Sequence, residues 1–412
     1  MRRRVPRPRT GDPIVTTYAV IGGGIVGSAI ARALARSADD VTVTVLEKEP
    51  EPGLHQTRRN SGVVHAGIYY APGSAKARFS RRGVGQLRAY CEEKGLRYDE
   101  CGKLIVALDQ TQRRRLDDLR DRAHANGVPG VRMLGAAGLR DIEPHVRGVA
   151  GLHSPTTAIV DFTEVAAALL ADTIDAGGTV RTGFEVVGFA QSDDEVRVIG
   201  AHGETIAVDR VVVCAGLHSD RLARLAGDDE YPRIVPFRGE FALLRPGRRD
   251  LVRGLIYPVP DPRYPFLGVH LTRRVDGEVM VGPNAVLALA REGYRRRDVD
   301  PREVLGLARW SGFRRFAWSN RRTAVDELRG SLSRRRFAAA ARQYLPELTV
   351  DDLVPAPAGI RAQAMDADGT LVDDFRVSRV GNIVCVRNAP SPAATACLAI
   401  ADDIVADLLD RT

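Results

Sequence analysis

The sequence predicts a mixed α/β fold in which a Rossmann-like nucleotide-binding domain is joined to an antiparallel-sheet domain. Three observations predict it. A complete βαβ unit with a glycine-rich turn stands near the start of the chain, a buried apolar strand recurs after residue 207, and short strands separated by Pro and Gly fill the middle. The chain has 412 residues. Because domains run to roughly 100 to 200 residues, two connected domains are expected.

The βαβ unit is read from residues 18–47. A strand at 18–21 leads into the glycine turn Gly22–Gly27, an alanine-rich helix runs to about residue 36, and a second strand at 41–46 ends in an acid. Gly22 is expected to permit the tight turn, Gly24 to let the backbone approach a diphosphate, and Gly27 to let helix and strand pack closely.

The ligand of this unit follows from the same residues. The free N–H groups and the dipole of the helix N-terminus favour a diphosphate. Glu47 stands 20 residues after Gly27, where a carboxylate accepts hydrogen bonds from an adenosine ribose. An acid at this place favours an unphosphorylated ribose, so FAD or NAD is expected rather than NADP.

The remaining elements are read from periodicity and from Gly and Pro punctuation. Further helices are expected at residues 74–94, 110–125, 162–176, 302–344 and 393–409. Further strands are expected at residues 103–108, 179–189, 195–199, 208–214, 241–244, 255–259, 266–271, 278–281 and 383–386. The run at 208–214 ends in Ala215 and Gly216, as a buried parallel strand that feeds a ligand-facing turn would.

The order of these elements predicts a discontinuous nucleotide-binding domain. We expect it to comprise residues 17–90, 150–230 and 350–412, with a substrate-binding domain at 91–149 and 231–349. Residues 1–16 are expected to form a loose basic tail without the apolar segment of a secretory signal.

Composition restricts the class of protein. At 44% hydrophobic and 27% charged residues the chain is globular, and no run of about 18 apolar residues predicts a membrane-spanning helix. Five cysteines without CxxC spacing predict no metal site and favour a reducing cytoplasm. The formal net charge of +8 comes almost wholly from scattered arginines, which favours a solvated surface over a nucleic-acid-binding patch.

Several ordered motifs are more specific than the glycine turn. They are His55-Gln56-Thr57, residues 60–70 (NSGVVHAGIYY), 236–240 (PFRGE), 257–260 (YPVP), 266–270 (FLGVH), 282–285 (GPNA), 359–363 (GIRAQ), 371–375 (LVDDF) and 388–395 (NAPSPAAT). Together they resemble the L-2-hydroxyglutarate oxidase or dehydrogenase family of the D-amino-acid oxidase-like flavoproteins, over residues 18–409. The resemblance implies an FAD-binding Rossmann-like domain of the D-amino-acid oxidase/glutathione reductase type with an antiparallel-sheet substrate domain.

The chain departs from the family pattern in three places. Arg58-Arg59 stands where a Gly-His pair is common, Ala71 replaces a frequent lysine, and Phe241-Ala242 replaces a more aromatic pair. The first departure lies beside the loop expected to pass under the flavin. It therefore bears on the identity of the substrate rather than on the fold.

The implied reaction is the oxidation of L-2-hydroxyglutarate to 2-oxoglutarate, with hydride transfer from C2 to flavin N5 and electrons passed to oxygen or a quinone. A neutral histidine suits the base that takes the hydroxyl proton. His270 is the first candidate, although an arbitrary histidine more often only bonds a neighbouring strand. His65 and His55, in the loop beside the flavin, are the alternatives.

A dicarboxylate substrate needs fixed cations, and the arginine fork binds a carboxylate through two hydrogen bonds. Arg361, expected in a turn facing the flavin, and Arg238, in the substrate sheet, are the candidates. Tyr257 and Tyr69 are candidate hydroxyl donors, although a buried tyrosine more often simply packs.

The cofactor-binding set combines the glycine turn with the family motifs, and no metal ligand is expected. It comprises Gly22, Gly24, Ile25, Val26, Gly27, Glu47, Lys48, Thr57, Asn60, Ser61, Gly62, Val186, Ala215, Gly216, Gly359, Arg361, Pro390 and Ser391.

Alternative functions remain open at this point. The same fold serves enzymes that oxidise amino acids, glycerol 3-phosphate or other hydroxy acids, some of them biosynthetic. A flavin-dependent RNA-modifying protein is disfavoured, because aromatics are 6% of residues and do not interleave with the arginine runs. Cytoplasmic location with peripheral contact at the inner membrane face is expected, with residues 310–336 as the candidate surface.

Overall fold

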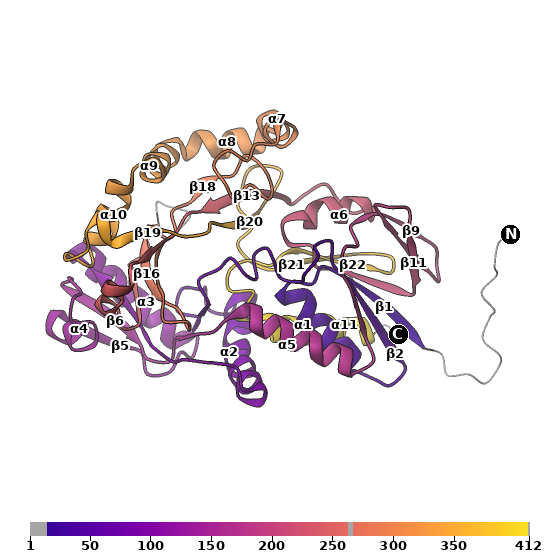
Figure 1. Cartoon of the computed structure of the whole chain (residues 1–412), viewed down its shortest axis with the longest axis horizontal. Helices are drawn as coiled ribbons and strands as arrows, with labels where there is room; N and C mark the ends of the chain where they lie inside the picture. The colour runs from indigo at the N-terminus through magenta and orange to yellow at the C-terminus, as the bar shows by residue number, and fades with distance from the viewer. Residues whose placement is uncertain (1–14, 263–266, 411–412) are drawn as a thin grey trace.

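The computed structural model describes residues 15–262 and 267–410. Figure 1 shows two sheet-based parts side by side, with the sheet that contains β1 and β2 on the right and the sheet that contains β6 and β16 on the left. Most of the expected basic tail lies outside the described residues, and β1 already begins at Thr16. No helix in the described ranges is long and apolar enough to cross a membrane.

The first part is built on a six-stranded sheet in the order β21-β22-β12-β1-β2-β8. The strands are parallel except β21, which runs antiparallel to β22. Their bounds are Thr16–Ile21 (β1), Val41–Leu46 (β2), Thr179–Arg181 (β8), Arg210–Val213 (β12), Arg376–Val380 (β21) and Ile383–Asn388 (β22).

Both faces of this sheet are covered. Alternate residues of the strands face opposite sides, and helices α1, α2, α5 and α11 pack on the side of Val20 and Val45, while α6 and a small sheet of β9, β10 and β11 pack on the side of Ala19 and Leu46. The bounds are Ile25–Ala35 (α1), Ala75–Lys94 (α2), Phe162–Asp175 (α5), Ser219–Leu225 (α6), Cys397–Leu409 (α11), Val186–Gln191 (β9), Val196–Gly200 (β10) and Thr205–Val208 (β11).

The second part is built on an eight-stranded sheet in the order β19-β14-β17-β16-β15-β4-β6-β5. It is antiparallel except for the parallel pair β4 and β15. The bounds are Lys103–Ala107 (β4), Arg132–Gly135 (β5), Ala150–Ser154 (β6), Ala242–Leu244 (β14), Leu255–Pro258 (β15), His270–Arg273 (β16), Val279–Gly282 (β17) and Leu353–Pro355 (β19), with α3 (Gln110–Ala125) and α4 (Ala136–Ile142) beside β4, β5 and β6.

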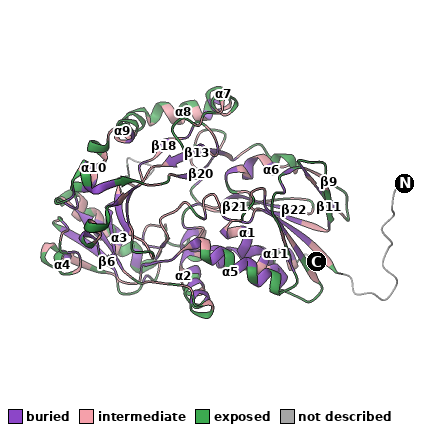
Figure 2. Ribbon diagram, in the orientation of Figure 1, coloured by how far each residue is buried: buried purple, intermediate pink, exposed green. Residues whose placement is uncertain are grey.

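Smaller elements connect the two parts. Strands β13 (Arg233–Gly239), β18 (Val286–Leu287) and β20 (Gly359–Met365) form a third sheet, and β3 (Val63–Val64) pairs with β7 (Ala158–Ile159). Four successive helices then form an outer arm, which Figure 2 shows largely exposed or intermediate in burial. They are α7 (Pro301–Arg309), α8 (Ser311–Ser319), α9 (Arg321–Leu332) and α10 (Arg334–Arg342).

Several expectations differ from the structure. The helical stretch expected at 302–344 is divided into α7, α8, α9 and α10, and the strand expected at 266–271 begins at His270 in the described residues. The strand expected at 179–189 is two strands in different sheets, because the chain turns at Gly183, where φ is +67°. The last helix begins at Cys397 rather than at residue 393, since Pro390 and Pro392 hold the chain in turns. Arg361 lies within strand β20 and not in a turn.

Strands β6 and β19, which the sequence division placed with the nucleotide-binding part, are hydrogen-bonded in the eight-stranded sheet. An apolar strand of this length carries no local signal for which of two sheets it joins, so the pairing partner decides.

Helix α2 is held against the C-terminal segment by a close backbone approach at Gly83. A Cβ atom at this position would lie 2.5 Å from the Thr395 carbonyl oxygen and 2.7 Å from the Ala396 Cα. Gly85, two residues later in the same helix, has nothing within 4 Å of such an atom. The two glycines form a matched pair for a stability test.

We expect Gly83→Ala to destabilise the protein by about 1–3 kcal/mol, because backbone must move to admit the methyl group. Gly85→Ala is expected to stabilise it by about 0.5–1 kcal/mol, since alanine has a higher helix propensity than glycine at an exposed helical position. Thermal and urea unfolding of the two variants measure this difference. Equal effects of the two substitutions would contradict the close packing of α2 on residues 395–396.

Candidate active site

A cavity of about 710 Å³ lies where the carboxyl ends of the parallel strands meet the third sheet. Residues that follow β1, β2, β12 and β22 line it, as do the 53–65 loop and strand β20. The carboxyl edge of a parallel sheet is where α/β proteins bind their ligands. The cavity is therefore the candidate site for both cofactor and substrate.

The glycine turn has the predicted geometry. Gly22 has a φ of +106°, a conformation that side chains disfavour, and a Cβ there would lie 2.5 Å from the Cys214 carbonyl oxygen. A Cβ at Gly27 would lie 2.0 Å from the Gly22 carbonyl oxygen. The tight turn and the close packing of α1 against the end of β1 are thus confirmed.

The N-terminus of α1 faces the cavity, and side chains bond two backbone N–H groups of its first turn. Glu47 accepts a hydrogen bond from Gly23 N at 2.8 Å, and Thr57 Oγ1 accepts one from Ile25 N at 3.0 Å. A Cβ at Gly24 would meet only Thr57 Oγ1, at 3.4 Å. Gly24 leaves the space in front of the helix N-terminus free, which fits a diphosphate approached by the backbone.

Most of the predicted cofactor residues line this one cavity. They are Gly22, Gly24, Ile25, Val26, Gly27, Glu47, Lys48, Thr57, Asn60, Ser61, Val186, Ala215, Gly216, Gly359, Arg361, Pro390 and Ser391. Gly62 lies outside it. Its φ is +73° and its N–H bonds the Asn60 side chain, so Gly62 shapes the turn that presents the loop.

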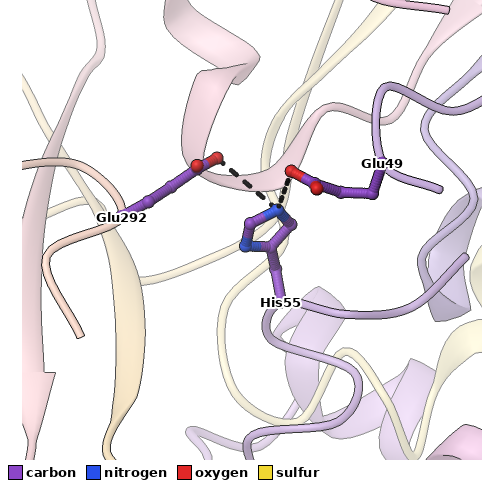
Figure 3. A group of neighbouring side chains, drawn as sticks. All are labelled: Glu49, His55 and Glu292. Atoms are coloured by element: carbon purple, nitrogen blue, oxygen red, sulfur yellow. Dashed lines mark hydrogen bonds and ion pairs between the residues drawn. The ribbon is translucent and has the colours of Figure 1, made fainter. Parts of the chain in front are cut away.

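Figure 3 shows a cluster of Glu49, His55 and Glu292, of which His55 and Glu292 line the cavity. The three side chains have the spacing of a metal site, but Lys48 forms ion pairs with both carboxylates, at 2.7 Å to Glu292. Burial alone would raise the pKa of Glu292, yet hydrogen bonds from His218 and Lys48 outweigh it and lower the pKa to about 2. The lysine supplies the cation that this cluster needs.

Both ring nitrogens of His55 are engaged by neighbouring side chains. Its Nδ1 lies 2.7 Å from the Tyr294 hydroxyl and its Nε2 lies 3.0 Å from Glu49. Arg59, which also lines the cavity, stacks on the Tyr294 ring at 4.1 Å, whereas Arg58 is exposed and bonds Glu51. Of the Arg58-Arg59 pair, only Arg59 faces the site, and Phe241 of the third departure from the family pattern also lines the cavity.

The two other candidate histidines lie in different positions. His65 lines the cavity, and its buried Nδ1 has no hydrogen-bond partner among the described residues. Burial, and then the charges of Lys103 and His270, hold the pKa of His65 well below its usual value. His270 is not among the lining residues. Its Nδ1 lies 2.9 Å from the Gly268 carbonyl oxygen, and burial lowers its pKa to about 4.

The predicted substrate residues are likewise divided. Arg361 lines the cavity, but Arg238, Tyr257 and Tyr69 do not. Arg238 bonds Glu240 at 3.3 Å and the Arg295 carbonyl at 3.2 Å, so it supports the loop outside the cavity. Both tyrosine rings lie near Lys103, and burial raises the pKa of Tyr257 to about 12.

Sequence reasoning missed Lys103, which begins β4 beside these tyrosines, with its Nζ 4.1 Å from the Tyr257 ring centroid. One signal was available, since Lys103 opens an otherwise apolar strand. It also missed Thr395, whose Oγ1 accepts a hydrogen bond from His65 N at 3.0 Å and so fixes the backbone of that histidine.

A protein-family model described as "FAD dependent oxidoreductase" matches residues 17–408. Among solved structures, L-α-glycerophosphate oxidase from Mycoplasma pneumoniae with FAD bound has a TM-score of 0.77 at 23% identity, covering 95% of this chain and 94% of that one. L-proline dehydrogenase from P. horikoshii has a TM-score of 0.71 at 19% identity, covering 97% and 94%. The fold and the glycine cradle therefore define an FAD-dependent oxidoreductase.

Sequence relatives are more specific. The mitochondrial L-2-hydroxyglutarate dehydrogenase of Homo sapiens is 44% identical over 98% of this chain and 92% of its own length. The L-2-hydroxyglutarate dehydrogenase of Escherichia coli K12 is 41% identical over 94% and 92%. The chain belongs to the L-2-hydroxyglutarate dehydrogenase family, which confirms the resemblance, the fold class and FAD as cofactor.

Proposed function

We propose that the protein oxidises L-2-hydroxyglutarate to 2-oxoglutarate. The observation that carries the proposal is identity above 40%, over nearly the whole chain, with enzymes named for this substrate. The cavity supports it, because Arg361 and His65, whose Nδ1 has no hydrogen-bond partner in the described part of the chain, line the same space as the cofactor cradle. FAD, when bound, supplies the acceptor of the hydride from C2.

His65 is the base in this proposal. It lines the cavity, its Nδ1 is unpartnered, and its lowered pKa keeps the imidazole neutral near pH 7, ready to take the substrate hydroxyl proton. His270, the first candidate from sequence, lies outside the lining and its Nδ1 bonds a carbonyl. We therefore propose that His270 supports the side chain of Tyr257. The centroids of the two rings lie 4.0 Å apart.

Arg361 binds a carboxylate of the substrate in this proposal. It stands on β20 at the cavity, where burial lowers its pKa and the Asp373 carboxylate acts in the opposite direction. A guanidinium stays protonated at every working pH, so this anchor does not depend on pH. The reduced enzyme passes its electrons to oxygen or to a quinone.

A membrane surface is the second part of the proposal. Residues 301–342, the arm of α7 to α10, contain eleven arginines, three acidic residues and no lysine. The arm thus carries a formal charge of +8, equal to that of the whole chain, and the other 370 residues are neutral in sum. A concentrated cationic surface attracts anionic lipid headgroups at about 1 kcal/mol per arginine.

The arm also exposes large apolar side chains. Trp318 is 71% exposed and Leu332 67%, the two highest values among the exposed large hydrophobic residues in the described part of the chain. Arginines together with exposed Trp and Leu on successive helices are the pattern of interfacial helices. We propose that the arm docks on an anionic bilayer, where a quinone acceptor is available.

The substrate is tested by anaerobic mixing of the holoenzyme with L-2-hydroxyglutarate while flavin absorbance is followed. We expect rapid bleaching with this compound and slow or no bleaching with its D-enantiomer, L-lactate, L-malate or glycerol 3-phosphate. Bleaching by another member of the panel alone would replace the substrate and leave the FAD-dependent fold intact.

We expect His65→Asn to lower kcat/KM by about a hundredfold or more with flavin still bound, because general-base catalysis is lost. His270→Asn is expected to cause a much smaller loss. The base acts in its neutral form, so the lowered pKa of His65 places the acid limb of the kcat/KM profile below pH 6.5. A larger effect at His270, or a limb above that pH, would contradict the assignment.

Membrane docking is tested by co-sedimentation with vesicles of zwitterionic lipid, with or without anionic lipid. Binding should require anionic lipid and weaken with salt. The double variant Trp318→Ser/Leu332→Ser should lose it, whereas Ile174→Ser, which alters an apolar residue 53% exposed on α5, should not. Equal sedimentation of both variants would rule out the arm as the docking surface.

A further inference from the structure

Residues 291–294, which lie between β18 and α7, are bonded to the nucleotide-binding part through three of their four side chains. We call this segment the strap. Arg291 is its buried anchor. The guanidinium donates to the Leu217 carbonyl oxygen at 2.7 Å and to both oxygens of Asp220, at 2.9 Å for Oδ2. Because Arg291 and Asp220 are 7% and 4% exposed, this two-bonded ion pair fixes the strap against the start of α6.

Glu292, the second residue of the strap, lines the cavity and bonds two lining residues from the other part of the molecule. Its carboxylate lies 2.7 Å from Lys48 Nζ and 2.9 Å from His218 Nε2. Figure 3 shows Glu292 and Glu49 reaching the His55 ring from different segments, and His55 Nε2 lies 3.5 Å from Glu292. One carboxylate of the strap thus joins side chains from separate places in the nucleotide-binding part.

The two residues that Glu292 bonds follow strands on either side of β1. Lys48 follows β2 and His218 follows β12, and the order of the sheet places β1 between these two strands. Because neighbouring strands lie about 4.8 Å apart, the ends of β2 and β12 are separated by about 10 Å. The Glu292 carboxylate therefore bridges the carboxyl end of β1, where the glycine turn begins.

This bridge is attached to the cofactor cradle on both sides. The space in front of Gly24 and the free N–H groups of α1 fit a diphosphate. Lys48 directly follows Glu47, whose carboxylate bonds the glycine turn. His218 stands two residues after Gly216, which lines the same cavity. A ligand with its diphosphate at the glycine turn therefore lies next to the bridge.

We propose that the strap retains FAD in the cavity, with Glu292 as the positioning residue that closes it across the cofactor cradle. Contacts that must break before a ligand leaves slow its release more than they speed its binding. Glu292 acts through Lys48 and His218 and does not touch the reacting atoms. The inference does not depend on the identity of the substrate, since FAD as cofactor follows from the family.

Glu49 supplies a matched control from the same cluster. Its carboxylate also bonds Lys48 and His55. All three of these residues belong to the loop that follows β2, so their bonds join no second part of the chain. Glutamine at position 49 or 292 removes one negative charge from the same cluster, but only the change at 292 opens the bridge.

The experiment measures the release of FAD from diluted holoenzyme, with free flavin separated by ultrafiltration and measured by its absorbance. We expect Glu292→Gln, which keeps the shape of the side chain, to accelerate release by about tenfold, as loss of a partly exposed charged hydrogen bond does. Glu49→Gln should accelerate it by less than about twofold. The effect of Glu292→Gln should shrink as salt is raised, because salt already weakens the ion pair in the wild-type enzyme.

Tyr294→Phe tests the strap at a second residue. It removes the hydroxyl that lies 2.7 Å from His55 Nδ1 and keeps the ring on which Arg59 stacks, so folding should be preserved. We expect FAD release to be about fivefold faster, as for the loss of one neutral hydrogen bond. Wild-type release rates in both strap variants, or equal acceleration by Glu292→Gln and Glu49→Gln, would overturn the inference.

The retention of FAD and the proposed reaction are tested by separate readouts. Bleaching by L-2-hydroxyglutarate reports on chemistry at the bound flavin, whereas the strap variants report on how long the flavin stays bound. If L-2-hydroxyglutarate does not bleach the flavin but release follows Glu292, the strap stands and only the substrate is lost.

Discussion

The cavity depends on one backbone contact, that between the Gly27 α-carbon and the Gly22 carbonyl. No Cβ fits there, since it would lie 2.0 Å from the oxygen. The contact lets α1 begin directly after β1 with its free N–H groups toward the cavity. Glu47 and Thr57 bond Gly23 and Ile25 in this same turn. The loop that carries His65 is therefore positioned from the same point that holds the cofactor.

The residues of the cofactor half of the site could be predicted because most of them lie close together in the sequence. The turn, the helix and Glu47 lie within one βαβ unit, and spacing alone assigns their roles. The family motifs added residues 388–395, far away in sequence, and those residues do line the cavity. Arg361 was placed at the site but in a turn, since a strand of seven residues bounded by Gly359 resembles a loop in sequence.

The substrate half could not be predicted in the same way. Lys103 meets Tyr257 because β4 pairs in parallel with β15, a contact between segments about 150 residues apart. No local pattern specifies that pairing, and no pattern separates His270, which ends outside the cavity, from His65, which lines it. The only signal in the sequence was a lysine in an otherwise apolar strand. The role of that lysine depends on which strand pairs with its own, and the sequence does not specify the pairing.

The distribution of cations follows the chemistry of each type. Arginine keeps its proton in any environment, so it suits the exposed arm, where constant attraction is needed, and Arg361, which only anchors. Lysine and histidine release their protons when burial makes the charged form costly. Near the cavity, burial lowers the pKa values of His65, His270 and Lys103. In the proposed reaction the base must be neutral before the substrate arrives, and burial, which lowers the pKa of His65, keeps it so.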